Sequence, residues 1–189
     1  MTLWFTSDSH FSHANIIKYC NRPFANVREM DQCMVDRWNE CVKPSDHIYH
    51  LGDVTMMRPK YVKHILEQLS GHKRLIRGNH DIYKTKEYIE AGFEEIYGVR
   101  VIDNLLMTHI PVHPDSLGGF DANVHGHIHD RPNFAPVKRF KRVNGVLDET
   151  RPYLVSYINI CVEATNYRPI TLEEIKQMVR GEGGLYGRG

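Results

Sequence analysis

The chain has 189 residues, of which 41% are hydrophobic and 25% are charged. These values exclude a chain that is disordered over most of its length, because there is enough apolar material for a sizeable core. Lys and Arg number 24 and Asp and Glu 23, so the net charge of +1 neither requires nor excludes a phosphate-bearing partner. No apolar run has the length of a membrane-spanning helix, and the first residues lack the pattern of a signal peptide. We therefore expect a cytoplasmic protein with no membrane partner.

Cysteine and histidine usage point to different chemistry. The four cysteines form no CxxC pair, so we expect reduced, packed thiols, no disulfide-linked partner and no zinc site built on cysteine. The 12 histidines are unevenly placed. Five of them fall in one short stretch: His109, His113, His125, His127 and His129. This crowding is the first indication of metal chemistry.

The first half of the chain alternates predicted strands with predicted helices. The expected strands cover residues 3–7, 47–51 and 73–77, and the expected helices begin at Ser12, near Asn26, near Val62 and after Asp81. Asn26 and Glu29 are spaced as a capping box. Behind them Met30, Met34 and Trp38 recur at helical spacing, which predicts core packing rather than a cofactor site.

The second half contains further strands and one more helix. We expect strands over 96–102, 105–108, 122–124 and 153–162, with a basic, proline-containing loop over 130–152. Thr171 and Glu174 begin the last helix as a second capping box. The alternation favours a single α/β domain over residues 1–180, followed by a flexible glycine-rich tail over residues 181–189.

Polar side chains follow five of the predicted strands, just beyond the point where each strand ends. They are Asp8-Ser9-His10, Gly52-Asp53, Gly78-Asn79-His80-Asp81, His109 and Gly126-His127-Ile128-His129. In α/β proteins, ligands bind in the space beyond the carboxyl ends of the strands. The five segments therefore predict one site at one edge of the fold.

The side chains at this edge are carboxylates, an amide and imidazoles, which suit divalent ions such as Mn, Fe, Zn or Ni. They are too numerous for one four-coordinate ion and suit two ions that share one carboxylate. Glycine precedes Asp53, Asn79 and His127, which allows a sharp turn and a close approach of the chain to an ion. We expect two divalent metal ions as cofactors, with Mn²⁺ the ion to test in vitro.

Taken in order, these motifs resemble the complete signature of the calcineurin-like metallophosphoesterases, over residues 8 to 129. The resemblance implies an α/β fold, a four-layer α/β/β/α sandwich of two sheets flanked by helices, with a dinuclear site at the sheet edge. It implies that Asp8, His10, Asp53 and His129 bind one metal, that Asp53, Asn79, His109 and His127 bind the other, and that Asp53 bridges. His80 is then the catalytic histidine that binds no metal.

Two features set the chain apart from larger members of that family. Its short length resembles the small bacterial and phage members rather than the Ser/Thr protein phosphatases. Its second motif continues as Val54-Thr55-Met56-Met57 and lacks the second Asp that many members carry. The residue that orients His80 is therefore left open, with Asp81 as one candidate.

The resemblance implies a metal-dependent hydrolase. We expect a phosphodiesterase acting on a nucleotide or nucleic-acid phosphodiester, with a hydroxide that bridges the metals as nucleophile. His80 would assist the leaving alkoxide. A phosphomonoesterase is the nearest alternative, because the metal core is common to both. A non-catalytic metal-binding scaffold or interaction module, and a nucleic-acid-binding protein, are alternatives of other classes, and the oligomeric state is open.

Substrate contacts are less specified by the sequence. His13 follows the first motif and can face the substrate or shape the short helix, and Arg22 is a candidate phosphate contact. Arg131 to Leu147 is basic with interleaved phenylalanines, a pattern of single-stranded nucleic-acid or nucleotide binding that is also common in solvated loops. The expected partner is a phosphorylated small molecule, a nucleotide or a nucleic acid.

Overall fold

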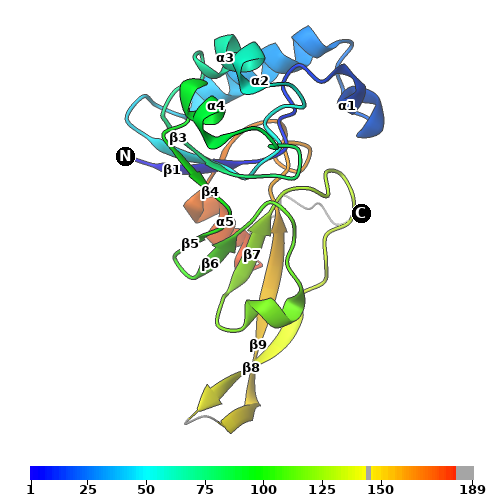
Figure 1. Ribbon diagram of the computed structural model, residues 1–189. Coiled ribbons are helices and arrows are strands. Elements are labelled where there is room, and N and C mark those ends of the chain that lie inside the picture. The colour runs from blue at the N-terminus through cyan, green and yellow to red at the C-terminus, as the bar shows by residue number, and fades with distance from the viewer. Residues whose placement is uncertain (144–145, 182–189) are drawn as a thin grey trace.

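Two five-stranded sheets form the centre of the fold (Figure 1), in a computed structural model that describes residues 1–143 and 146–181. Sheet 1 has the strand order β10-β1-β2-β3-β4. Its strands are β1 Leu3–Thr6, β2 His47–His50, β3 His72–Ile76, β4 Glu95–Tyr97 and β10 Ile170–Thr171. β1 to β4 are parallel, and β10 pairs antiparallel with β1.

Sheet 2 has the order β5-β6-β7-β9-β8. Its strands are β5 Arg100–Ile102, β6 Leu105–Met107, β7 Ala122–His125, β8 Val137–Val143 and β9 Val146–Asn159. The three central strands, β6, β7 and β9, run parallel, whereas the two edge strands pair antiparallel with their neighbours. Each sheet therefore has a parallel centre, whose strands all end at one edge.

The chain passes from one sheet to the other between β4 and β5. The strand expected over 96–102 is in fact two strands, which Gly98 and Val99 separate. β4 pairs with β3 in sheet 1, and β5 pairs with β6 in sheet 2. The sequence pattern predicts a single strand because both pieces are short and β-prone. The point at which the chain changes sheet has no distinct hydrophobicity pattern.

The α-helices are α1 Ala14–Tyr19, α2 Val27–Cys41, α3 Pro59–Leu66, α4 Thr85–Glu90 and α5 Leu172–Val179, and η1 Pro114–Leu117 is a 3₁₀ helix. At α2 the side chain of Asn26 accepts the N–H of Glu29, while the Glu29 carboxylate accepts the N–H of Ala25. At α5 both hydrogen bonds of the Thr171 capping box are present, as expected. Ser12 does not cap α1; it donates to the Asp31 carboxylate instead, and His13 is the N-cap residue.

Three clusters of buried apolar side chains define the layers. One joins α2, α3 and α4 to the outer face of sheet 1, and it contains Met30, Met34 and Trp38 as expected. The second lies between the two sheets and includes Ile175 of α5. The third lies on the far face of sheet 2, where η1 contributes Leu117. The order is helices, sheet 1, sheet 2 and η1, so η1 stands where the four-layer sandwich expects an α-helix (Figure 1).

The basic segment expected as a loop over 130–152 is largely a β-hairpin. β8 and β9 pair along their length, with an irregularity between Phe140 and Lys141. The hairpin extends away from the helices (Figure 1). Prolines and charged residues in the segment conceal the strand pattern, because edge strands tolerate both.

Two other expectations concern the whole chain. In the described part, no helix has both the length and the apolar character to cross a membrane. The division into one domain over 1–180 and a tail over 181–189 stays a prediction, and residues 182–189 lie outside the described part. The cytoplasmic location also stays a prediction.

Candidate metal centre

The two sheets are joined at the edge where the predicted motifs lie. Ser7, just after β1, forms a parallel bridge with Cys161, just after β9. The N–H of Val162 donates to the Ser7 carbonyl at 3.1 Å, and the N–H of Asp8 donates to the Gly52 carbonyl at 3.0 Å. Main-chain hydrogen bonds therefore tie the strand ends together, and polar side chains from both sheets converge.

A first group of candidate ligands consists of Asp8, His10 and His129. Asp8 Oδ1 lies 3.9 Å from His10 Nε2 and 3.7 Å from His129 Nε2. Asp53 Oδ2 lies 3.8 Å from the same His10 nitrogen. The four residues expected to share the first metal therefore do meet.

A second group consists of Asp53, His109 and His127. Asp53 Oδ2 lies 3.3 Å from His109 Nε2, and Asn79 Oδ1 lies 2.9 Å from that same nitrogen. His109 Nδ1 is held by the Leu51 carbonyl at 2.8 Å, which turns Nε2 toward Asp53. Because Asp53 Oδ2 faces both His10 and His109, it lies between the two groups, where a bridging ligand belongs.

These residues fit divalent metal ions. Metal–ligand bonds of about 2.1 Å place neighbouring ligand atoms about 3.0 to 3.4 Å apart in octahedral or tetrahedral shells. The 3.3 to 3.9 Å separations are at or slightly above that spacing. Asp8 Oδ1 and His10 Nε2 are buried and have no hydrogen-bond partner among the described residues. Buried polar atoms of native proteins are normally paired, and a metal ion would satisfy both.

The backbone at the ligands is strained. The φ angle is positive at five of the seven candidate ligands: Asp8, His10, Asp53, His127 and His129. Each such non-glycine residue costs about 1–3 kcal/mol, and such residues cluster at functional sites. Asp and His adopt positive φ more readily than most residues, but five such residues at one place are typical of a functional site.

Two glycines make room for the carboxylates. A Cβ at Gly126 would lie 2.2 Å from Asp8 Oδ2, and a Cβ at Gly78 would lie 2.1 Å from Asp53 Oδ1. Both distances are far below van der Waals contact. The glycines before His127 and Asn79 thus admit the aspartates of the neighbouring segments, a more specific role than close approach to an ion.

Asp8 is fixed by its second oxygen. Oδ2 accepts hydrogen bonds from Ser7 Oγ at 2.5 Å, from the His127 N–H at 2.9 Å and from Cys161 Sγ at 3.2 Å. These partners hold the carboxylate so that Oδ1 faces the imidazoles of His10 and His129. Outer partners of this kind orient metal ligands and tune their affinity.

Glu163 supports the other side of the first group. Its Oε1 lies 3.0 Å from His129 Nδ1, which leaves Nε2 of the same ring to face Asp8. Arg22 donates to the same carboxylate oxygen from Nη2 at 2.7 Å and from Nε at 2.8 Å. A carboxylate–histidine pair directed at a metal is a common outer arrangement.

The charges of the metal-free centre follow from burial and these contacts. Burial lowers the pKa of His10 to about 2, so this imidazole is neutral and can act as a ligand. Burial raises the pKa of Asp53, but hydrogen bonds from His109 and the His80 N–H and the charges of His109 and His10 together outweigh it and lower the pKa to about 2. Burial lowers the pKa of His129, but hydrogen bonds to Cys20 and Glu163 and the charge of Asp8 raise it to about 10. A metal at this ring would displace a proton.

His80 lies at the open side of the centre. Its side chain is 41% exposed, and its Nε2 is 4.0 Å from Asp53 Oδ2. Its own N–H donates to Asp53 Oδ1 at 2.9 Å, which fixes the position of the residue. His80 thus lies beside the candidate ligands, and its ring is partly exposed to solvent.

Asp81 does not orient His80. Its carboxylate is buried and accepts the N–H groups of Asp53 at 2.7 Å, Gly78 at 2.8 Å and Val54 at 3.3 Å. It ties the second motif to the third, and the side chains of neighbouring residues point apart here. Ring contacts place His10 beside His80, with 5.8 Å between the centroids.

No family model matches the chain. An uncharacterized protein of Methanocaldococcus jannaschii, MJ1445, is 34% identical to it over 187 residues, which cover 94% of this chain and 90% of that protein. The chain belongs to the family of MJ1445. AQ665 of Aquifex aeolicus, a protein of unknown function with a solved structure, is 27% identical to the present chain. The superposition covers 94% of this chain and 98% of AQ665, with a TM-score of 0.66. Nuclease MPE of Pseudomonas putida, at 18% identity, a TM-score of 0.47 and coverage of 67% and 61%, is too dissimilar to support an argument.

In this MJ1445-family protein, the two predicted substrate contacts have different surroundings. His13 lies beside the first group, with its ring centroid 5.7 Å from that of His10. Arg22 has a side chain with no exposed surface. Besides Glu163, its guanidinium donates to the carbonyls of Asp8 at 2.7 Å and Ser9 at 2.9 Å. The structure therefore gives Arg22 a positioning role and leaves it no surface for a phosphate.

Glu163 is the functional residue that sequence reasoning missed. It follows β9 as the other motifs follow their strands, and the expected strand ended one residue before it. Cys20 also lies near this residue, in a third group with His129 and Glu163, although no site built on cysteine was expected. Two members of this third group, His129 and Glu163, are already joined by a hydrogen bond. We therefore interpret the third group as a set of residues that orient His129 in the first group. His50 and His125 are buried and hydrogen-bond to Ser9 and Asn133.

Proposed function

We propose that the chain is a dinuclear metal-dependent phosphoesterase that acts on phosphodiesters. The observation that carries the proposal is the arrangement of two ligand groups around one shared carboxylate, Asp53. Asp8, His10, Asp53 and His129 would hold one ion, and Asp53, Asn79, His109 and His127 the other. The resemblance of these motifs to the calcineurin-like metallophosphoesterases supports the same assignment.

Two divalent ions at such a site supply positive charge for the phosphate oxygens and activate water near neutral pH. The chain supplies the rest. Asp8 and Asp53 bring only two negative charges, and the amide of Asn79 adds none, so the centre stays attractive to a phosphate. His10 and His109 face Asp53 Oδ2 from either side.

His80 is the proposed catalytic residue of the chain itself. It is open to solvent and lies within 4.0 Å of the shared carboxylate, where a phosphoester leaving group can reach its ring. There it can hold a proton for the departing oxygen. We favour a phosphodiesterase over a phosphomonoesterase because His80 can assist a poor alkoxide leaving group and because the segment over residues 131–147 is basic. Such general acid catalysis contributes about 10²–10⁴-fold.

The test uses metal-stripped protein reloaded with Mn²⁺, and compares hydrolysis of bis-p-nitrophenyl phosphate with that of p-nitrophenyl phosphate. We expect turnover that requires the metal and prefers the diester. His80→Ala should lower the turnover number about 10²–10⁴-fold for an alkyl diester, whose alkoxide needs a proton, and less for the p-nitrophenyl esters, while metal content stays near two ions per chain. Asp53→Asn should lose both metal and turnover.

Each other outcome selects a rival. A preference for the monoester would indicate a phosphatase. Two bound ions without turnover of either ester would favour a non-catalytic metal-binding scaffold. Loss of metal in His80→Ala would show that His80 is a ligand, contrary to the role assigned here.

A further inference from the structure

A pocket with walls made of rings lies on the far face of sheet 2. It has a volume of about 400 Å³, within the range of small-molecule sites. Five of its eight lining residues carry rings: the aromatic His113, Phe134 and Tyr157 and the prolines Pro111 and Pro114. The other three are two valines and an alanine, so no charged side chain lines it. We call it the ring pocket.

The walls of the ring pocket are held in place by hydrogen bonds. Tyr157 donates its hydroxyl to the Val112 carbonyl at 2.8 Å, and the Val112 N–H donates to Asn123 Oδ1 at 3.0 Å. Asn133 donates to the Tyr157 carbonyl at 2.6 Å and accepts the Phe134 N–H at 3.0 Å. The polar groups of Tyr157 are thus used internally, and its buried ring packs against the rings of Phe134 and His125.

Phe134 is the accessible wall of the pocket. Its side chain is 54% exposed, although its ring lies 5.3 Å from that of Tyr157. An exposed aromatic ring beside a preformed apolar pocket can stack on a planar group at little conformational cost. Stacking of a nucleic-acid base on an aromatic side chain is worth about 1–3 kcal/mol and does not depend on which base is present.

The ring pocket lies close to the metal centre along the chain. Pro111 is two residues after His109, so their Cα atoms are at most about 7 Å apart. Next to the Phe134 wall, Asn133 Oδ1 accepts a hydrogen bond from His125 Nε2 at 3.1 Å, and His125 is two residues before His127. Candidate ligands and pocket walls are therefore carried by the same two strand ends, those of β6 and β7.

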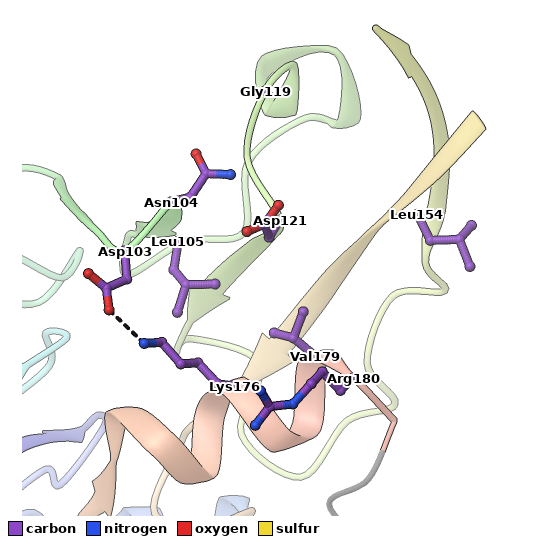
Figure 2. A pocket seen from close by; sticks show the side chains of 9 residues that line it. All are labelled: Asp103, Asn104, Leu105, Gly119, Asp121, Leu154, Lys176, Val179 and Arg180. Atoms are coloured by element: carbon purple, nitrogen blue, oxygen red, sulfur yellow. Dashed lines mark hydrogen bonds and ion pairs between the residues drawn. The ribbon is translucent and has the colours of Figure 1, made fainter. Parts of the chain in front are cut away.

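A second groove, which Figure 2 shows, differs in character. Asp103, Asp121, Lys176 and Arg180 line it together with Leu154, and Lys176 forms an ion pair with Asp103 at 2.6 Å. Its lining carries both signs of charge and no aromatic ring. It offers no stacking surface, and its Leu154 is a comparably exposed apolar residue for control substitutions.

We propose that the ring pocket binds the base of a nucleoside phosphodiester whose phosphate occupies the metal centre. This inference rests on the proposed function and names its substrate class. The exposed ring of Phe134 stacks on the planar base, and the largely apolar lining suits a neutral group. The pocket thus selects esters that carry a base over esters of simple alcohols.

Direct binding is measured first, on metal-free protein, with adenosine as the probe and ribose as its control. We expect adenosine, and not ribose, to shift the aromatic NMR signals of Phe134 and Tyr157. Phe134→Ala should abolish the shift at Tyr157. Leu154→Ala should leave it unchanged, because that residue lies in the other groove. Shifts caused equally by ribose, or retained in Phe134→Ala, would overturn the proposal.

Catalysis is measured second, on Mn²⁺-loaded protein, with adenosine 5′-(methyl phosphate) and ribose 5-(methyl phosphate). Phe134→Ala should raise KM about 5- to 150-fold for the nucleoside ester and leave KM for the ribose ester unchanged. Phe134→Tyr, which keeps a ring, should retain the wild-type KM. Equal KM values for both esters in the wild type would refute the pocket's role while leaving the phosphodiesterase intact. Adenosine binding without hydrolysis of either ester would refute the phosphodiesterase and keep the pocket.

Discussion

Replacement of Arg22 by methionine tests whether this residue positions the metal centre or contacts substrate. The Arg22 side chain is fully buried and donates to Glu163 and to the carbonyls of Asp8 and Ser9. Arg22→Met removes one of the two cationic partners of the buried Glu163 carboxylate and leaves the His129 imidazolium as the other. Removal of one partner from a buried ion pair costs about 3–5 kcal/mol. If the only role of Arg22 were to contact a substrate phosphate, its removal would not lower the free energy of unfolding.

The assay is urea unfolding of the metal-free protein, followed by circular dichroism. We expect the free energy of unfolding to fall by about 3–5 kcal/mol in Arg22→Met, and to recover in part when Glu163→Gln is added. Arg37→Met is the matched control, because Arg37 also lies over the Tyr167 ring but is exposed. It should cost no more than about 1 kcal/mol. Equal losses in the two variants would refute the positioning role of Arg22.

Two further substitutions probe the site and the fold. Gly126→Ala places a Cβ 2.2 Å from Asp8 Oδ2, so Asp8 must move. We expect the Mn²⁺ affinity, measured by calorimetry, to fall at least tenfold. Unchanged affinity would contradict the close packing of Gly126 against Asp8. Hydrogen bonds from the N–H groups of Thr2 and Lys43 lower the pKa of Asp46, so the stability they confer is present above the unfolded pKa of about 3.9 and is lost as pH falls through the folded pKa. Asp46→Asn should therefore lower Tm at pH 7 and differ less from the wild type at pH 3, and a difference that does not depend on pH would exclude this linkage.

The strand-end motifs were predictable because their logic is local. A short β-prone run followed by Asp, Asn or His is visible in the sequence, and parallel strands bring such ends to one edge. The capping boxes at Asn26 and Thr171 were predictable for the same reason, since cap and partner are three residues apart. The structure brings the predicted ligands together in the two expected groups.

What the sequence did not reveal depends on contacts between distant residues. Arg22 and Glu163 are 141 positions apart, and no period or motif links them. The role of Asp81 depends on the fold of three separate turns, so its position next to His80 is misleading. The β8–β9 hairpin was missed because its edge position relaxes the hydrophobic pattern that identifies a strand.

The passage of the chain between sheets at Gly98 divides the metal centre between two segments. Asp8, His10, Asp53 and Asn79 precede this point, and His109, His127 and His129 follow it. Each ligand group draws on both segments, so neither segment alone can complete a coordination shell. A chain cut at Gly98 would yield two pieces that β10 pairing with β1 and the core between the sheets still join, with the ions of the proposed centre as an additional link. The ions of the proposed centre would therefore link the two segments of the chain as well as take part in the reaction.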